Sequence, residues 1–506
     1  MSDQPAISFA SARGPGEGVV VVLAEDGPKL TPMAQDFDKK SKGLLTKAGE
    51  ISGFKGKKDS YVNLLMPTGL NLSRLVVAGI GKPAEFGPED WLNLGGCLRG
   101  VLAGKEGQTA HVFIETVSGD VDTAEVASFA LGMLLRGYSF KKYKTTDRSK
   151  KAAKDVEKSL KKVVIHCADP RAATKAFATG QAIAHGVDIA RDLVNEPANV
   201  LGPTEFAQRA KELTKVGVQV EVLNEPALKK LGMGALLAVG QGSDQPSHVV
   251  VMQWRGLGPK GGDPVVVVGK GVTFDTGGLS LKPSTGMEDM KGDMAGAACV
   301  VGLMHTLAER KAKANVVGII GLTENMPGGG AQRPGDVVKA MSGKTIEVLN
   351  TDAEGRMVLA DCLWYAQQRF KPKAMINLAT LTGAVMVALG KEHAGLFSNN
   401  DELSNKLLAA GTETGEKLWR LPLGPKYDKL IDSKVADMKN TGGRWGGSIS
   451  AAQFLQRFIK DGTPWAHLDI AGTGMACGDT DINRSWGSGY GVRLLDRLVR
   501  DQYERQ

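Results

Sequence analysis

The sequence predicts an α/β fold of two domains, each a mixed β-sheet flanked by helices. Its 506 residues exceed what one hydrophobic core usually covers. Short apolar runs rich in β-branched residues alternate with helix-like segments, and this alternation begins again near Asn195. The composition, 42% hydrophobic and 23% charged, is that of a globular chain and not of a disordered one.

The N-terminal part shows the strand and helix alternation of a βαβ protein. Strands are expected at 19–24, 74–80, 111–115 and 162–167, and helices at 88–102 and 123–135. A helical segment from Ala172 to Leu193 joins the two halves. We therefore expect an N-terminal α/β domain at 1–170, a connecting helix at 171–190 and a larger C-terminal domain at 191–506.

The C-terminal part repeats the alternation and predicts a mixed sheet with helices on both faces. Strands are expected at 248–254, 264–269, 314–322, 344–349, 374–379 and 465–470, and helices at 294–311, 356–369 and 449–460. The segment Gly256 to Gly261 matches the dinucleotide-binding pattern G-x-G-x-x-G, but a strand and not a helix follows it. We interpret it as a hairpin loop between two strands.

The sequence favours a reducing cytoplasm. Five cysteines are scattered, odd in number and without a Cys-x-x-Cys pair, which argues against a disulfide framework and a thiolate zinc site. No run of about 18 apolar residues is present, so we expect no membrane span. Residues 1–14 contain Asp3 and no apolar h-region, so we expect no signal peptide.

The net charge of +8 is local. The stretch 136–162 holds eleven basic and three acidic residues, so it alone accounts for the excess. Two interpretations remain open for this basic segment. We favour a solvated, lysine-rich linker, and the alternative is an electrostatic footprint for DNA.

The first candidate site segment, Lys270-Gly-Val-Thr-Phe-Asp275-Thr-Gly-Gly278, follows a predicted buried strand. The ends of such strands are where α/β sheets place their sites. Taken alone, Lys270 and Asp275 could equally form a loop ion pair, and Lys282, in the same glycine-rich loop, could be a solvated lysine. Asp293 stands where an apolar helix begins, where its alternative role is that of a helix N-cap.

The second candidate segment runs from Asn350 to Arg356, between a predicted strand and a helix. Because alternate residues of an extended chain point the same way, Asp352 and Glu354 would present two carboxylates to one spot. A polar loop with a helix cap would explain this clustering of charge poorly, because Arg356 would lie on the same side.

Taken together, the segments predict a metal site. Four carboxylates at strand ends, from Asp275, Asp293, Asp352 and Glu354, would repel one another strongly unless cations neutralise them. Two divalent ions would supply that charge. Oxygen-rich ligation without His or Cys suits zinc, manganese or magnesium.

These segments resemble the leucyl (cytosol) aminopeptidase family. The similarity lies in Lys270 to Gly278, Lys282, Met290 to Met294 and Asn350 to Arg356. The segment from Asn350 to Arg356, together with the residue after it, is close to diagnostic of the family. The family usually has Leu after this arginine, and this chain has Met357. Further similar segments are Arg191 to Pro197, Ala379 to Gly383 and Trp465 to Ala471, so the resemblance covers most of 185–495.

The resemblance implies two divalent metal ions per subunit, manganese or zinc. Asp275 and Glu354 would bridge them. Lys270 and Asp293 would complete one metal site, and Asp352 would complete the other.

The remaining roles also come from the resemblance. Lys282 would polarise the scissile carbonyl, and Arg356 would hold a bicarbonate ion that acts as general base on the attacking water. The implied substrate cleft is lined by Met290, Asn350, Ala353, Thr380, Leu381 and Gly383.

The resemblance thus implies a dinuclear metallo-exopeptidase whose catalytic domain is the C-terminal one. Its substrates would be peptides, from which it releases N-terminal residues with a leucine-type preference, and its assembly would be a homohexamer. The rival interpretation is a DNA-binding architectural protein, because some bacterial relatives of the family bind DNA as hexamers. The two activities could coexist in one chain.

Overall fold

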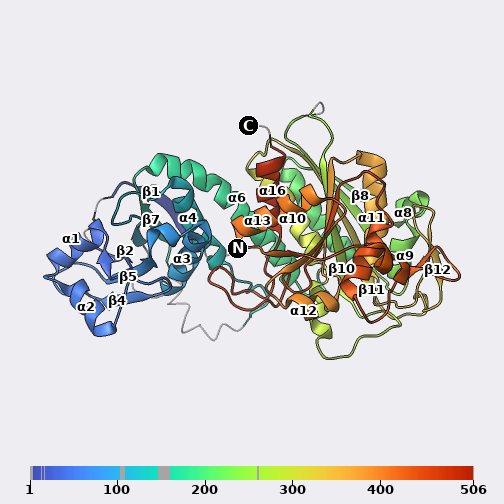
Figure 1. The fold of residues 1–506 in the computed structure, drawn as a ribbon, viewed down its shortest axis with the longest axis horizontal. Helices are drawn as coiled ribbons and strands as arrows, with labels where there is room; N and C mark the ends of the chain where they lie inside the picture. Colours follow the sequence, from blue (N-terminus) through green and yellow to red (C-terminus); the bar gives the residue numbers. More distant parts are fainter. Residues whose placement is uncertain are drawn as a thin grey trace. The chain divides into compact units, whose positions relative to one another are not determined.

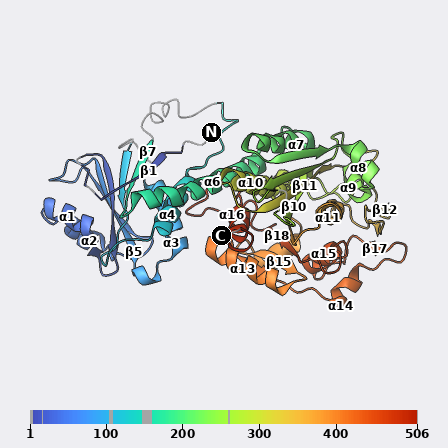
Figure 2. The same ribbon diagram turned by 90° about the horizontal axis from the view of Figure 1, so that it is seen from above.

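The computed structural model describes residues 4–12, 14–15, 17–102, 109–145, 160–258 and 261–504. The chain divides into two compact units (Figures 1 and 2). Unit 1 comprises Met1–Ala184 with Asp479–Ser485, and unit 2 comprises His185–Gly478 with Trp486–Gln506. Helix α6 (Pro170–Asn195) runs across the boundary between them. No helix within the described ranges is both long and apolar enough to cross a lipid bilayer.

Unit 1 contains a mixed sheet in which β1, β7, β6, β2 and β5 run parallel, and β4 and β3 are antiparallel additions. In sheet order these strands are β1 (Ala6–Ala10), β7 (Lys162–His166), β6 (Thr109–Phe113), β2 (Val19–Glu25), β5 (Arg74–Gly81) and β4 (Tyr61–Leu65), with β3 (Lys29–Leu30) paired to β2.

Helices cover both faces of this sheet. Helices α1 (Pro32–Lys40) and α2 (Leu44–Ser52) lie on one face, and α3 (Pro88–Val101) and α4 (Thr123–Gly137) lie on the other (Figures 1 and 2). Alternate residues of β2 point toward α1 and α2, so that Val20 and Val22 belong to one buried cluster with Phe37 and Leu45.

Unit 2 contains a larger mixed sheet. Its four central strands, β18, β14, β10 and β11, run parallel, so their carboxyl ends lie at the same edge. The full order is β16 (Leu418–Arg420), β15 (Ala394–Ser398), β18 (Trp465–Asp469), β14 (Ala374–Ala379), β10 (Val265–Asp275), β11 (Asn315–Asn325), β9 (His248–Arg255) and β8 (Gln219–Leu223).

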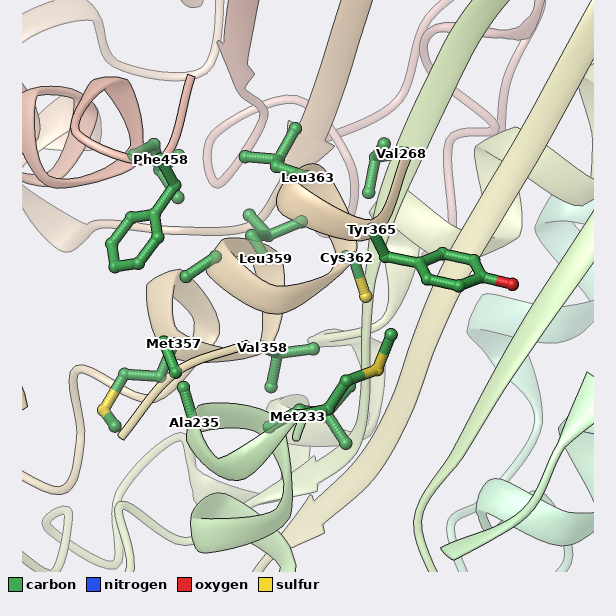
Figure 3. Close-up of a cluster of buried hydrophobic side chains, with 14 of the residues drawn as sticks. Met233, Ala235, Val268, Met357, Val358, Leu359, Cys362, Leu363, Tyr365 and Phe458 are labelled. Atoms are coloured by element: carbon green, nitrogen blue, oxygen red, sulfur yellow. The ribbon is translucent and has the colours of Figure 1, made fainter. Parts of the chain in front are cut away.

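Strand β10 separates the helices of the two faces. Val266 and Val268 face a hydrophobic cluster formed with α9 (Gly234–Gly240) and α11 (Gly355–Phe370) (Figure 3). Gly269, which points the other way, lies under α10 (Ala295–Glu309). The other helices of unit 2 are α7 (Pro203–Lys211), α8 (Glu225–Leu231), α12 (Gly383–Leu389), α13 (Asp401–Thr414), α14 (Pro425–Asp428), α15 (Gly447–Gln456) and α16 (Val492–Gln502).

The predicted fold class, two domains with mixed sheets flanked by helices, is confirmed. Two details differ. The strand expected at 344–349 is the short β13 (Thr345–Glu347), which pairs with β12 (Val337–Lys339) and β17 (Met438–Lys439) in a separate small sheet. The hairpin interpretation of 256–261 is wrong, because β11 lies between β9 and β10 and is the strand that pairs antiparallel with β9. Residues 259 and 260 of that loop lie outside the described residues.

Gly269 provides a test of the close packing of α10 on the sheet. A Cβ atom there would lie 2.6 Å from the Cα of Ala297 and from the carbonyl oxygen of Gly296, and both are backbone atoms of α10. Replacing this glycine by alanine would raise the free energy of unfolding by about 0.5–1 kcal/mol through backbone entropy, but overpacking would lower it by about 1–3 kcal/mol. Gly269→Ala should therefore lower the thermal unfolding midpoint. Gly329→Ala is the matched control, because nothing lies within 4 Å of a Cβ at that position. Equal midpoints for the two variants would contradict the assigned packing.

Candidate active site

A cavity of about 530 Å³ opens at the edge of unit 2 where the parallel strands end. This is the edge at which α/β sheets bind ligands, because the chain leaves each strand there in a loop. All the candidate residues from the sequence line this one cavity: Lys270, Asp275, Lys282, Met290, Asp293, Asn350, Asp352, Ala353, Glu354, Arg356, Thr380, Leu381 and Gly383.

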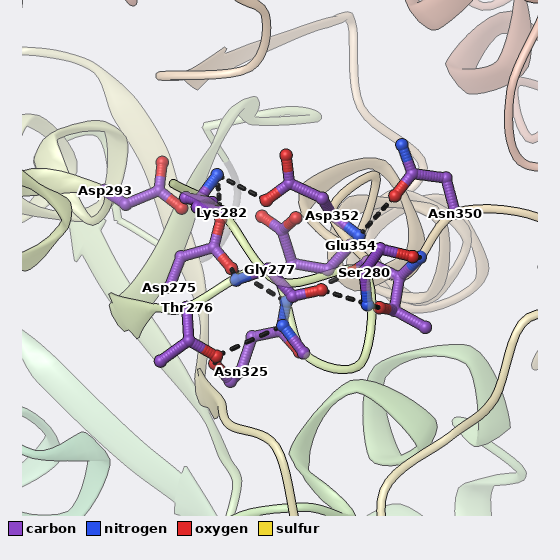
Figure 4. A network of polar contacts seen from close by, with 12 residues as sticks. Asp275, Thr276, Gly277, Ser280, Lys282, Asp293, Asn325, Asn350, Asp352 and Glu354 are labelled. Carbon is purple, nitrogen blue, oxygen red and sulfur yellow. Dashed lines mark hydrogen bonds and ion pairs between the residues drawn. The ribbon is translucent and has the colours of Figure 1, made fainter. Parts of the chain in front are cut away.

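Four segments bring the charged groups together, and one of them is the loop after β10 that carries Lys282 (Figure 4). Strand β10 carries Lys270 in its second half and ends on Asp275. Asp293 follows the 3₁₀ helix η4 (Met287–Gly292). Asp352 and Glu354 immediately precede α11. Convergence of the four carboxylates, which the sequence alone could not establish, is therefore a property of the fold.

The segment before α11 is a turn and not an extended strand. The backbone N–H of Asp352 donates to Oδ1 of Asn350 over 2.9 Å, and that of Ala353 donates to the Asn350 carbonyl over 3.2 Å. Glu354 already has helical backbone angles. The expectation that period-two alternation aligns the two carboxylates is thus wrong. A turn stabilised by Asn350 brings them to the same cavity.

Lys270 is buried between two carboxylates. Its Nζ lies 2.7 Å from Oδ1 of Asp293 and 2.8 Å from Oε1 of Glu354, and it donates to the carbonyl of Thr380 over 3.0 Å. Burial alone would lower the pKa of Lys270, but the nearby carboxylates outweigh it and raise this pKa above its usual value. The alternative of a simple loop ion pair with Asp275 does not describe this residue.

Lys282 takes the place beside Asp275. Its Nζ lies 2.9 Å from Oδ2 of Asp275 and also pairs with Asp352. Only 21% of its side chain is exposed, so a freely solvated lysine does not describe it. Burial opposes its charge, yet Asp275 and Asp352 raise the pKa of Lys282 above the ordinary value.

The carboxylates are crowded enough to disturb their own protonation. Burial, reinforced by Asp275, raises the pKa of Glu354 to about 8. Burial also raises the pKa of Asp293 to about 6, against the opposing effect of Lys270. Carboxylates held so close together are stabilised by positive charge placed between them.

The donor set fits a divalent cation. One oxygen from each of Asp275, Asp293 and Glu354 lies within 4.8 Å of the others. Oδ2 of Asp293 is buried, and among the described residues no donor reaches it. Asp293 does not cap α10 either, since Met294 holds the N-cap position without a side-chain bond. Carboxylate oxygens with one amine suit manganese, zinc or magnesium.

Arg356 lies in the first turn of α11 and is buried at the side of the cavity. Its Nη1 donates to the carbonyl of Asn440 over 2.9 Å, and within the described part of the chain its Nε has no hydrogen-bond partner. Burial lowers the pKa of Arg356 to about 10, so the guanidinium remains charged at neutral pH.

Two further polar residues support the site, although the sequence-based predictions assigned them no role. Nδ2 of Asn325, at the end of β11, donates to Oδ1 of Asp275 over 2.7 Å. Asp469, at the end of β18, accepts from Oγ1 of Thr382 over 2.6 Å and from the N–H of Leu381 over 3.1 Å. Each is the last residue of a buried strand, as Asp275 is of β10, so the sequence could have pointed to both of them.

The 3₁₀ helix η4 packs closely against other side chains, and this packing positions Asp293, the residue that follows it. A Cβ at Gly292 would collide with Sδ of Met475 and would lie 2.6 Å from the ring of Trp486. The neighbouring Lys291 places its Nζ 4.8 Å from the centre of the same ring. Only glycine allows η4 to approach this Met and Trp pair so closely.

Comparison with known proteins identifies the family. Residues 188–496 match the family described as "Cytosol aminopeptidase family, catalytic domain", and residues 19–147 match "Cytosol aminopeptidase family, N-terminal domain". A probable cytosol aminopeptidase of a Bradyrhizobium species is 58% identical over 100% of this chain and 99% of the relative. A probable cytosol aminopeptidase of a Chelativorans species is 57% identical over 100% of both chains.

Solved structures agree with the sequence comparison. A variant of tomato leucine aminopeptidase superposes with a TM-score of 0.86 and is 32% identical, covering 99% of this chain and 98% of its own. The bottromycin maturation enzyme BotP in complex with Mn gives a TM-score of 0.82 and 33% identity over 96% of this chain and 99% of its own. The resemblance seen in the sequence is confirmed, and the chain belongs to the cytosol aminopeptidase family.

Proposed function

We propose that this aminopeptidase is a dinuclear metallo-exopeptidase that releases N-terminal residues, with a leucine-type preference, from peptides. One observation carries the proposal. Four carboxylates and two lysines from four separate segments converge in a single cavity at the carboxyl edge of the sheet. Membership of the family supports the reaction class.

Five residues would hold two divalent ions, manganese or zinc. Asp275 and Glu354 would be shared by both ions, Lys270 and Asp293 would complete one site, and Asp352 would complete the other. The cluster of carboxylate oxygens within 4.8 Å and the unsatisfied Oδ2 of Asp293 support this assignment. When bound, such a pair of ions acidifies a water molecule and stabilises the negative charge that develops on the scissile carbonyl. Because the similar enzyme BotP has been solved in complex with Mn, manganese is the first metal to test.

The chain's own cations would act on the peptide group. Lys282, which is the partly exposed one of the two lysines, polarises the scissile carbonyl and stabilises negative charge as it develops. Arg356 would hold bicarbonate, which would supply a general base beside the scissile bond. Its buried guanidinium, with Nε lacking a partner among the described residues, supports an anion at that position.

The cleft would bind the peptide by its free N-terminus. The α-amino group is placed at the carboxylate-rich end of the cavity, which restricts cleavage to the first peptide bond. The flanking contacts come from Met290, Asn350, Ala353, Thr380, Leu381 and Gly383, all of which line the same cavity.

The organisation of the chain belongs to the same proposal. We assign the N-terminal domain to 1–170, the connecting helix to 171–190 and the catalytic domain to 191–506. The enzyme would act in the cytoplasm as a homohexamer.

DNA binding by the basic segment 136–162 stays a prediction. Residues 146–159 of it lie outside the described residues, so its strongest support is the local charge of +8. If it binds DNA, a gel shift should weaken steeply with salt, because phosphate contacts release counterions. Glutamine in place of the lysines between 141 and 158 should abolish that shift while peptide hydrolysis persists. A shift that survives these replacements would locate DNA binding elsewhere.

Metal removal tests the reaction directly. Prolonged chelation should abolish hydrolysis of a leucine chromogenic amide, and added manganese or zinc should restore it, because the proposed chemistry needs both ions. Hydrolysis rate and metal content are measured on the same samples. Full activity in protein shown to be free of metal would refute the metal-dependent mechanism.

The two lysines should respond differently to arginine. Lys270 pairs with Asp293 and Glu354 as an ammonium group in this structure, and it would have to lose a proton to coordinate a metal as a neutral amine. Arginine stays protonated and offers no lone pair. Lys270→Arg should therefore lose one of the two metal ions from each subunit. Lys282→Arg keeps its positive charge near the carbonyl, so it should retain both ions and lose mainly turnover. Metal content per subunit, measured on both purified variants, decides the matter. Two tightly held ions in Lys270→Arg would exclude Lys270 as a ligand.

A further inference from the structure

A fourth cation, Arg444, lines the cavity and is exposed. It belongs to the glycine-rich segment 441–447, which leads into α15 and has left-handed backbone angles at Gly443 (φ 91°) and Gly446 (φ 61°). The residue before this segment, Asn440, is fixed against the site. Its Oδ1 accepts the N–H of Leu349 over 2.9 Å, and its Nδ2 donates to the carbonyl of Asn350 over 2.6 Å.

The four lining cations differ in what neutralises them. Lys270 and Lys282 each lie between two carboxylates. Arg356 is buried and donates to a backbone carbonyl. The guanidinium of Arg444 lies over the ring of Trp445 at 5.0 Å, and within the ranges that the structure describes no carboxylate pairs with it. Arg444 is thus a cation facing the cavity with unused hydrogen-bond donors.

Burial gives the cavity a closed end and an open end. At the closed end Lys270, Asp275 and Glu354 are at most 2% exposed. Arg444 belongs to the exposed part of the lining, and its neighbour Trp445 is 77% exposed. A peptide whose amino group occupies the closed end, and whose chain runs along the lining to Arg444, would bring its carboxyl end to that guanidinium. The volume of about 530 Å³ lies within the range of about 300–1,000 Å³ typical of small-ligand sites.

We propose that Arg444 binds the C-terminal carboxylate of short peptides, so that the preferred substrates of this site are short peptides with a free carboxyl end. A guanidinium and a carboxylate form two parallel hydrogen bonds, a geometry that an amide or an aromatic amine at the same end does not reproduce. A longer peptide would carry its carboxylate past Arg444 and gain nothing from it. This inference rests on the proposed function, since it requires the peptide to enter with its amino end first.

The test compares free acids with their amides. Leucylglycine and leucylglycylglycine, each as the free acid and as the C-terminal amide, are hydrolysed by the manganese-loaded enzyme, and kcat and KM are determined separately. Arg444→Ala should reduce the preference for acid over amide, expressed as a ratio of kcat/KM, by about two- to five-fold, mainly through KM, as expected for one exposed charge-assisted contact. Arg444→Lys should recover part of the preference. Arg333→Ala, which removes an exposed arginine that pairs with Asp336 outside the cavity lining, should keep the wild-type ratio.

The outcomes separate this inference from the proposed function. If Arg444→Ala lowers kcat/KM equally for acids and amides, or leaves the acid preference intact at every peptide length, carboxylate recognition by Arg444 is refuted. Failure of the wild-type enzyme to hydrolyse leucine p-nitroanilide, which has no carboxylate to recognise, would instead refute the aminopeptidase function itself.

Discussion

The placement of four carboxylates in one buried cavity is the constraint on which the rest of unit 2 depends. Removing one partner from a buried ion pair typically costs about 3–5 kcal/mol, because it leaves the other charge buried without compensation. The fold meets this constraint by placing two ammonium groups among the four acids, each bonded to two of them. Gly355 leaves room for the side chain of Lys270. A Cβ at that glycine would lie 2.8 Å from the lysine Nζ.

A second set of polar residues holds the carboxylates and their loops from behind. Asn325 joins Asp275 to the carbonyl of Thr351, and so links β10 to the turn that bears Asp352. Asn440 links the same turn to Arg356. These amides have no charge to neutralise, and their contribution is to limit how far the acids can move apart. The geometry of the site is therefore maintained by neutral hydrogen bonds as well as by ion pairs.

The sequence predicted the elements of the fold better than their pairing. Runs such as Val19–Glu25 and Ala374–Ala379 are continuous β-branched or apolar segments, so the local sequence is enough to locate a strand. Whether a strand joins the main sheet depends on partners far along the chain, which is why β13 and the connection from β9 to β10 were misplaced. The site shows the same difference between what local sequence indicates and what depends on distant residues. The charged residues were evident from their spacing and family resemblance, but their assignment as ligands remains a prediction. The support from Asn440, 91 residues beyond Leu349, could not be inferred from any local pattern.

The return of Asp479–Ser485 to unit 1 bears on how the protein is made. A Cβ at Gly96, in α3, would collide with the carbonyl of Asp481, so this late segment packs directly on a helix formed by early residues. Chains are synthesised from the N-terminus, and early domains generally begin to fold before later ones emerge. Unit 1 of this protein, however, lacks one of its own pieces until residues 479–485 have been synthesised. Its first 184 residues therefore wait, with that face of α3 uncovered, until the synthesis of unit 2 is nearly complete.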